Sequence, residues 1–106
     1  VYGIDPHDRS RHLIIANNKT YGTKKKHGII ISREVNDSWI FGNHSYDNAG
    51  SGIMIDRASV RNVIAGNTME RNSGDGLVFI ESSDNSSWGN TIRGNGKNGV
   101  RVRNSS

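Results

Sequence analysis

The chain repeats one phrase four times, in which a glycine is followed by an apolar run of alternating character. The copies are His27-Gly28-Ile29-Ile30-Ile31, Ser51-Gly52-Ile53-Met54-Ile55, Asp75-Gly76-Leu77-Val78-Phe79 and Asn98-Gly99-Val100-Arg101-Val102. Their glycines are separated by 24, 24 and 23 residues. A period of about two dozen residues, with short β segments and Gly or Asn at the corners, is typical of a solenoid in which each repeat forms one coil. We therefore predict an all-β parallel β-helix of about four coils, with 23–25 residues in each coil.

Two further columns have the same period. The pattern apolar-x-x-Asn runs from Ile15 to Asn18, from Ile40 to Asn43 and from Ile64 to Asn67, and Asn90 follows in phase with Ser87 at the apolar position. Asn48, Asn72 and Asn95 form the other column. We expect the amides of these columns to hydrogen-bond from coil to coil. A leucine-rich repeat has a similar length but needs a regular leucine pattern, and this chain has only two leucines.

The alternation of a strand assigns the faces of each coil. After each corner glycine, the first and third positions should point inward, and all of them are apolar: Ile29, Ile31, Ile53, Ile55, Leu77, Phe79, Val100 and Val102. The same register after Gly3 places Ile4 and Pro6 inside and leaves Asp5 and His7 outside. The His7 column continues through Ser32 and Asp56, and the next column holds Asp8, Arg33 and Arg57. The first coil has one extra residue, which we assign to the loop 23–26.

Composition agrees with short strands and frequent corners. Only 32% of the residues are hydrophobic, and there are 13 glycines. Gly and Asn tolerate left-handed backbone, so we expect them at the corners, and long helices are not expected. With no cysteine, disulfides and thiolate metal sites are excluded. No apolar run is long enough for a membrane span or a signal peptide. Neither end has an obvious cap, so we expect residues 1–106 to be a single β-helix segment, an excerpt of a longer solenoid.

Charge restricts the class of partner. The chain has 14 Lys and Arg against 10 Asp and Glu, a net charge of +4 and a pI near 9.8. This balance favours a polyanion: nucleic acid, an anionic lipid surface or an acidic polysaccharide. Nucleic acid is disfavoured, because carboxylates are mixed with the cations and no aromatic platform for base stacking is evident.

The predicted register gathers chemically useful groups at the amino end. Asp5, His7, Asp8, Arg33, Asp56 and Arg57 would share one outward strip, with Tyr2 at its edge and the lysine run 24–26 close by. A histidine beside carboxylates is suited to proton transfer, and a guanidinium one coil away can bind a substrate carboxylate through paired hydrogen bonds. Without the repeat, the segment Asp5-Pro6-His7-Asp8 would be read as a turn.

These residues also carry a family resemblance. Tyr2-Gly3-Ile4-Asp5-Pro6-His7-Asp8 resembles the signature of mannuronan C5-epimerases, which convert β-D-mannuronate into α-L-guluronate within alginate. The segment YGTKKKHGIIISREVNDS (residues 21–38) is similar to the bacterial periplasmic branch, and a weaker likeness extends through Ser105. The resemblance implies an interior piece of a right-handed β-helix, located in the periplasm. The secreted, calcium-dependent branch usually has Glu at the position of Asp8 and carries nonapeptide calcium repeats, which have no counterpart here.

The resemblance also implies roles for the residues and requires no cofactor or metal. His7 would remove the C5 proton, Arg33 would neutralise the substrate carboxylate, and water or Tyr2 would return a proton to the opposite face. Asp5 and Asp8 would orient His7 or contact sugar hydroxyls. Contacts with alginate would extend over Lys24, Lys25, Lys26, Asp56 and Arg57. A periplasmic alginate secretion complex is a further expected partner.

Three alternatives stay open at the level of sequence. A polyuronate lyase would start with the same C5 proton abstraction and then eliminate the 4-O substituent. A binding module would hold alginate along the basic strip without chemistry. In the third, individual residues have only structural roles. Arg33 would pair with Glu34 or Asp56 on the surface, the lysine run would be a solvated loop, and Tyr2 would pack at the edge of the coil. His27 and His44 are expected to be structural, because both lie at or near corners of the repeat.

Overall fold

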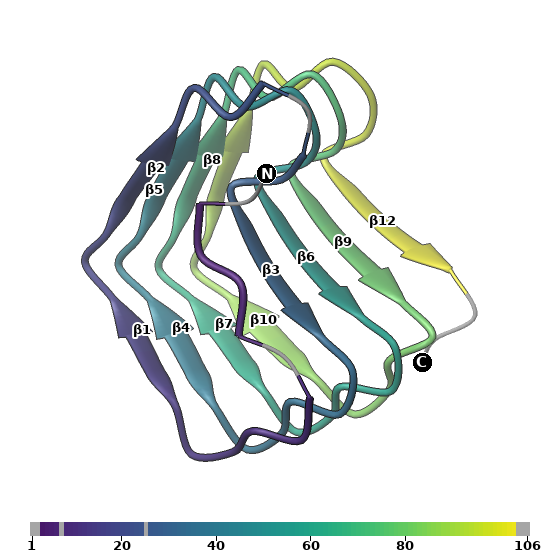
Figure 1. Cartoon of the computed structure of the whole chain (residues 1–106). Helices are drawn as coiled ribbons and strands as arrows, with labels where there is room; N and C mark the ends of the chain where they lie inside the picture. Colours follow the sequence, from purple (N-terminus) through teal and green to yellow (C-terminus); the bar gives the residue numbers. More distant parts are fainter. Residues whose placement is uncertain (1–2, 7, 25, 104–106) are drawn as a thin grey trace.

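The computed structural model describes residues 3–6, 8–24 and 26–103, and it consists of short strands stacked in three parallel sheets (Figure 1). The β1 sheet contains β1 (Ile14–Ala16), β4 (Trp39–Phe41), β7 (Val63–Ala65) and β10 (Ser86–Trp88). The β2 sheet contains β2 (Lys19–Tyr21), β5 (His44–Tyr46), β8 (Thr68–Glu70) and β11 (Thr91–Arg93). The β3 sheet contains β3 (Ile29–Ser32), β6 (Ile53–Asp56), β9 (Leu77–Ile80) and β12 (Val100–Arg103). The predicted parallel β-solenoid of about four coils is therefore confirmed.

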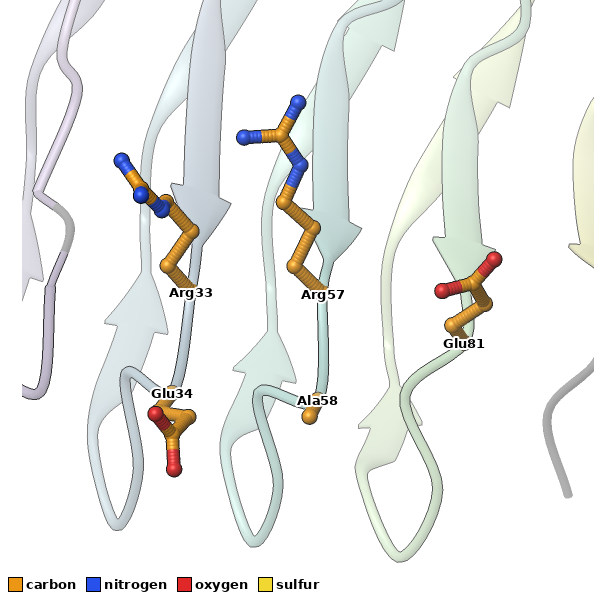
Figure 2. Close-up of a pocket in the computed structure, with 5 residues that line it drawn as sticks. All are labelled: Arg33, Glu34, Arg57, Ala58 and Glu81. Carbon is orange, nitrogen blue, oxygen red and sulfur yellow. The ribbon is translucent and has the colours of Figure 1, made fainter.

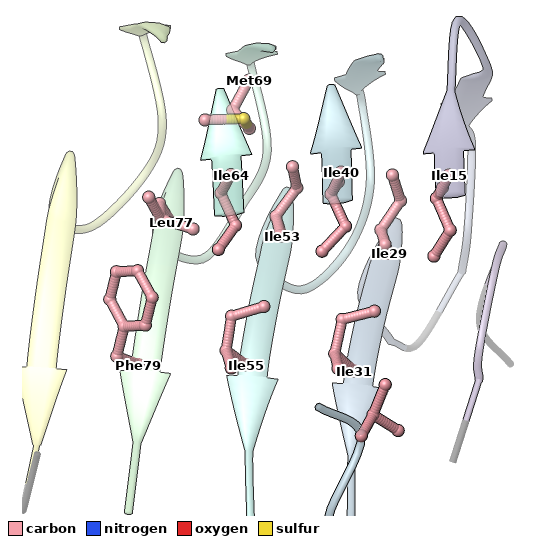
Figure 3. Close-up of a cluster of buried hydrophobic side chains, with 11 residues drawn as sticks. Ile15, Ile29, Ile31, Ile40, Ile53, Ile55, Ile64, Met69, Leu77 and Phe79 are labelled. Atoms are coloured by element: carbon pink, nitrogen blue, oxygen red, sulfur yellow. The ribbon is translucent and has the colours of Figure 1, made fainter. Parts of the chain in front are cut away.

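The interior is filled by the apolar positions that the period-2 pattern selects (Figure 3). In the β3 sheet, Ile29 pairs with Ile53 and Ile53 with Leu77, and all three are at most 1% exposed. Ile15, Ile40 and Ile64 of the β1 sheet pack against them in the same cluster. Leu13, Ile4 and Ile92 pack at its margin. Because each of the first three coils places Ile or Leu at these positions, the apolar core is continuous through them.

The expectation for the fourth coil is corrected in part. Val100 and Val102 continue the inward column, since they pair with Leu77 and Phe79. They are nevertheless 51% and 56% exposed. No further coil among the described residues packs against β12. The side chains of Val100 and Val102 therefore continue the inward column but stay exposed to solvent.

Both predicted asparagine columns form hydrogen-bonded ladders. Asn43 donates from Nδ2 to Asn67 Oδ1 at 2.9 Å, and Asn67 donates to Asn90 Oδ1 at 3.1 Å. In the other ladder, Asn48 donates to Asn72 Oδ1 at 2.9 Å. Each amide also reaches a backbone carbonyl of the preceding coil, as Asn67 does at Ile40. Buried amides with all of these partners satisfied hold one coil in register with the next.

The structure contains a third ladder that the sequence reading did not single out. Asn62 donates to Asn85 Oδ1 at 3.1 Å and to the Val35 carbonyl at 2.9 Å. Ser38 extends the ladder by donating its backbone N–H to Asn62 Oδ1. The column mixes Ser with Asn, which explains why it was not visible as an asparagine repeat.

The corner glycines are needed for a different reason from the one expected. Gly28, Gly52 and Gly76 do not have positive φ, whereas many Asp, Glu and Arg residues at the other corners do. What the position demands is space: a Cβ on Gly52 would lie 2.7 Å from Met69 Cγ and 2.8 Å from the Gly76 carbonyl oxygen. The glycine column therefore exists because coils approach one another closely there, not because the backbone is left-handed.

The extra residue of the first coil lies where the sequence placed it. The backbone N–H of Thr23 donates to Oδ1 of Asn48, 25 residues later. The backbone N–H of Gly50 donates to the carbonyl of Lys26, 24 residues earlier. The loop 23–26 therefore absorbs the difference. Within the described residues there is no helix long and apolar enough to cross a membrane.

Candidate functional site

The three outer faces of the solenoid differ in chemistry. The β1 sheet exposes large apolar side chains: Ile14, Trp39, Phe41 and Trp88. The β2 sheet carries an ordered network in which Glu70 contacts His44 Nε2 at 2.8 Å and Arg93 Nε at 2.7 Å, beside the stacked rings of Tyr21 and Tyr46. On this sheet Glu70, His44 and Arg93 are engaged with one another, whereas the third face carries charged residues that the sequence predicts for the site.

We call the outward surface of the β3 sheet the β3 face. Its middle is apolar and buried, formed by Ile30, Met54, Val78 and Ile80. Charged residues follow at the carboxyl end of each strand. Four residues occupy equivalent places there: Asp8 before the first coil, then Arg33, Arg57 and Glu81 at the ends of β3, β6 and β9 in the first three coils. We call these four residues the corner column. Equivalent backbone bonds align it, because the carbonyls of Arg33, Arg57 and Glu81 accept from Arg9, Glu34 and Ala58 of the preceding coils.

Left-handed backbone shapes this corner. Asp8, Arg33, Arg57 and Glu81 have φ of 60°, 68°, 55° and 50°. The next residues in the first three cases, Arg9, Glu34 and Ala58, also have positive φ. Such a residue costs of the order of 1–3 kcal/mol unless its surroundings determine it. Since the conformation recurs at each of these corners, it belongs to the corner of the solenoid.

The first hollow on the β3 face lies between the first two members of the corner column. Arg33 Nε is 3.2 Å from Asp8 Oδ1, and Arg9 Nε is 3.4 Å from Glu34 Oε2. These four residues line a shallow hollow of about 480 Å³. More than half of the Arg33 and Asp8 side chains is exposed, so their charges are accessible to a ligand in solution.

A second hollow of about 400 Å³ continues the first along the solenoid axis. It is lined by Arg33, Glu34, Arg57, Ala58 and Glu81 (Figure 2). The side chains of Arg33 and Arg57 run back alongside the strands that they follow, one coil apart. Arg57 Nε is 3.6 Å from Asp56 Oδ2, and its side chain is 63% exposed. Two exposed guanidinium groups, about 4.8 Å apart along the axis by the spacing of strands, form a short cationic track.

The structure brings together some of the predicted site residues. Asp8, Arg33 and Arg57 lie in the corner column, and Asp56 pairs with Ser32 in the ladder beside it. Ile4 pairs with Ile29, so the amino-terminal segment has the register expected from Gly3, and Asp5 is exposed. Tyr2, His7 and Lys25 lie outside the described residues.

The lysines lie elsewhere on the surface. Lys24 and Lys26 are exposed in the loop that precedes β3, whereas the corner column follows the end of β3. Neither of these two lysines lines the two hollows. Lys24 and Lys26 therefore lie at the opposite end of β3 from the backbone of the corner column, and not close to the predicted strip as expected.

Three charged residues of these hollows are absent from the predicted site, and one of them, Glu34, was considered only as a surface partner of Arg33. Arg9 and Glu34 pair with each other, and Glu81 completes the corner column at the third coil. The signal for Glu81 was available, because the register that aligns Arg33 with Arg57 also aligns Glu81. For Arg9 the only signal was its position directly after Asp8.

His27 lies at the amino end of β3 and has a defined hydrogen bond. Its Nδ1 accepts from the backbone N–H of Ser51 at 2.8 Å, which requires an unprotonated Nδ1. Burial lowers the pKa of His27 below the usual value, and the charge of Lys26 lowers it further. The ring is therefore a neutral structural partner of the next coil, as expected for a corner histidine.

No group of three or more His, Asp or Glu side chains that could hold a metal ion occurs within the described residues. The chemistry offered by the β3 face is thus that of exposed guanidinium and carboxylate groups. An exposed ion pair such as Asp8 with Arg33 adds at most about 1 kcal/mol to stability. Its position suits a second role, which is to orient the guanidinium toward an anionic ligand.

Comparison with known proteins agrees with this fold. Residues 2–106 match the family described as "Right handed beta helix region". The chain is 64% identical over 105 residues to a mannuronan C5-epimerase of Pseudomonas putida and 56% identical to mannuronan C5-epimerase AlgG of Azotobacter vinelandii. Each alignment covers 99% of this chain and 20% of the relative, so the chain spans about a fifth of the length of the curated relatives it matches.

A solved structure matches as well. The crystal structure of the periplasmic alginate epimerase AlgG has a TM-score of 0.97 and 58% sequence identity, over 98% of this chain and 24% of that one. The resemblance to mannuronan C5-epimerases, first recognised in the opening motif, is confirmed by these matches. The chain belongs to the right-handed β-helix family, and nearly its whole length is similar to a segment of mannuronan C5-epimerases.

Proposed function

We propose that this chain carries the catalytic surface of a mannuronan C5-epimerase, acting on alginate in the periplasm. The observation that carries the proposal is the ion pair of Asp8 and Arg33 on an exposed face. Asp8 directly follows the predicted base, His7, in the sequence. The similarity to epimerases over 99% of the chain supports the same reading. Secretion-complex partners, if the parent protein has them, would contact surfaces other than the two hollows.

The proposed reaction moves one proton off C5 and one proton onto it. His7 takes the C5 proton of a mannuronate unit, and the electron pair is delocalised into the carboxylate as an enolate-like species. Water or Tyr2 then delivers a proton to the opposite face, which inverts C5. No C–O bond is broken, and no cofactor is consumed.

The barrier to this reaction is the build-up of negative charge on a carboxylate that is already charged. Arg33 would neutralise that charge, and an interaction that strengthens as charge develops lowers the barrier. The Asp8 carboxylate contacts the Nε side of the guanidinium, and this leaves the Nη nitrogens to donate to the substrate. Asp8 is thus proposed to position Arg33 in addition to contacting sugar or His7, and Asp5 keeps its proposed contact with His7 or sugar.

Arg57 is proposed to bind the carboxylate of a neighbouring uronate unit, because it repeats the position of Arg33 one coil further along. Asp56 would accept from sugar hydroxyls beside it. Lys24, Lys25 and Lys26 are proposed to add positive potential for a polyuronate at the other end of β3, and no contact with the reacting unit is assigned to them.

Deuterium exchange tests the proposal. The full-length parent protein is incubated with polymannuronate in heavy water, and incorporation at C5 is followed by NMR. We expect incorporation together with guluronate formation, and both should be lost in His7→Gln while binding of the polymer persists. Unchanged exchange in His7→Gln would exclude His7 as the base.

The same samples separate the two rival functions. A lyase would produce an unsaturated product that absorbs in the ultraviolet, whereas an epimerase forms no unsaturated ends. A binding module would retain polymer without any exchange at C5 in the wild-type protein. We favour the epimerase because the relatives with 56–64% identity are named as epimerases.

A further inference from the structure

The corner column changes sign between the second and the third coil. Arg33 and Arg57 are followed by Glu81, which has the same kind of positive φ and lines the same hollow. Figure 2 shows the three side chains side by side at the ends of β3, β6 and β9. A ligand that extends along the track from Arg33 through Arg57 therefore meets a carboxylate at the next step.

Among the described residues, Glu81 has no cation within ion-pair distance. Within the described part of the chain, Arg33 is paired with Asp8 and Arg57 with Asp56, but no Lys or Arg nitrogen lies within ion-pair distance of Glu81. The residue is exposed. An unpaired, exposed carboxylate presents its full charge to whatever occupies the hollow.

We propose that Glu81 is a specificity-determining residue that ends the run of carboxylate-binding positions at the third coil. The inference rests on the proposed function, in which the ligand is a polyuronate. Carboxylates are accepted at Arg33 and Arg57, and a third carboxylate in line with them is repelled. The polymer must therefore leave the corner column at β9 or turn a face without a carboxylate toward Glu81.

The spacing of the coils determines which ligands reach Glu81. Successive coils are about 4.8 Å apart. A uronate unit in an extended chain is about as long as this spacing, so neighbouring units lie over neighbouring coils. A ligand of two units can occupy Arg33 and Arg57 without approaching Glu81, whereas a longer ligand reaches the third coil. The effect of Glu81 must therefore depend on ligand length.

Two substitutions and a matched control test the proposal in the full-length parent protein. Glu81→Gln removes the charge, and Glu81→Arg continues the column with a residue that the same backbone position already accepts at Arg33 and Arg57. Asp84→Asn is the control, because Asp84 is exposed, lies in the same coil and has positive φ, but does not line the hollow. It makes the same change in net charge as Glu81→Gln.

Binding of a mannuronate dimer and of a mannuronate hexamer is measured by calorimetry at low salt. For the hexamer we expect Glu81→Gln to lower Kd roughly threefold relative to Asp84→Asn, as for one exposed charge pair. Glu81→Arg should lower it by about tenfold, since the sign is reversed. For the dimer the three variants should agree. The differences should shrink as salt is added.

Three results would overturn the inference. Equal hexamer affinities for Glu81→Gln and Asp84→Asn would mean that only net charge matters. Weaker binding by Glu81→Gln would mean that Glu81 accepts hydrogen bonds from sugar hydroxyls. An equal gain in affinity for the dimer and the hexamer in Glu81→Gln would show that the effect of Glu81 does not depend on ligand length. Deuterium exchange at C5 in the wild-type protein distinguishes failure of the inference on Glu81 from failure of the proposed function. If the wild-type protein neither binds polymannuronate nor exchanges its C5 hydrogen, the epimerase function itself is refuted.

Discussion

Arg33 Nε lies 3.2 Å from Oδ1 of Asp8, so a cation at the corner of one coil is held by a carboxylate at the same corner of the coil before it. Both side chains are more than half exposed. An exposed ion pair of this kind contributes little stability in water, and its effect is to favour positions of the guanidinium close to Asp8. The predictions below separate this local chemistry from the packing that supports it.

Replacing arginine by lysine should distinguish the two cationic positions. Lysine keeps the charge but loses the planar fork that binds a carboxylate through two bonds. We expect Arg33→Lys to lower kcat by about 100-fold, because its contact strengthens in the transition state. Arg57→Lys should mainly raise KM, by several-fold. Initial rates of C5 exchange at varied polymannuronate concentrations measure both constants, and equal changes in the two variants would contradict the assignment of roles.

The buried amide ladder should be essential for stability. Asn67→Ala removes the partner of the Ile40 carbonyl and of two nitrogens of Asn43. Leaving buried polar groups unsatisfied costs about 1–3 kcal/mol each, so a loss of about 3 kcal/mol or more in the free energy of unfolding is expected. Chemical denaturation followed by circular dichroism gives the value. Asn98→Ala, at an exposed position, is the control and should change it by less than about 0.5 kcal/mol.

The glycine column offers a matched pair of substitutions. Gly52→Ala would place a Cβ 2.7 Å from Met69 Cγ and 2.8 Å from the Gly76 carbonyl oxygen. Gly99→Ala meets only an ordinary contact, at 3.6 Å from Ile92. We expect Gly52→Ala to destabilise by about 1–3 kcal/mol, as in overpacked cores, and Gly99→Ala to be neutral within about 0.5 kcal/mol. Similar thermal midpoints for the two variants would show that close approach is not what selects glycine.

Acid should destabilise the folded protein in part through Glu70 of the β2 sheet. Hydrogen bonds from Arg93 and then His44 lower the pKa of Glu70 to about 2. A carboxyl whose folded pKa is lowered contributes stability that is fully present above its unfolded pKa, near 4.3, and is lost as pH falls toward 2. The thermal midpoint of the wild-type protein should fall more steeply than that of Glu70→Gln over this window. Parallel curves would mean that the Glu70 contacts do not contribute.

Local patterns in the sequence determined the solenoid. The column of Ile29, Ile53 and Leu77 and the column of Asn43 and Asn67 both recur at a fixed period, so one coil predicts the next. The register at Gly3 followed from the same rule and correctly placed Asp8 beside Arg33. The opening motif and the segment 21–38 indicated the epimerase resemblance, which the comparisons confirm.

Tertiary structure alone decided what depends on the space between coils. The sequence could not show that Gly52 is required by the approach of Met69 and not by its own φ, that Val100 is left half exposed, or that Asn62 and Asn85 form a third ladder. It also could not show which exposed charges pair between neighbouring coils, such as Arg9 with Glu34. A repeat specifies which residue lies above which, because period and hydrogen bonding fix the register. How closely the side chains approach, and which charges are paired, depends on distances that exist only once the coils are stacked.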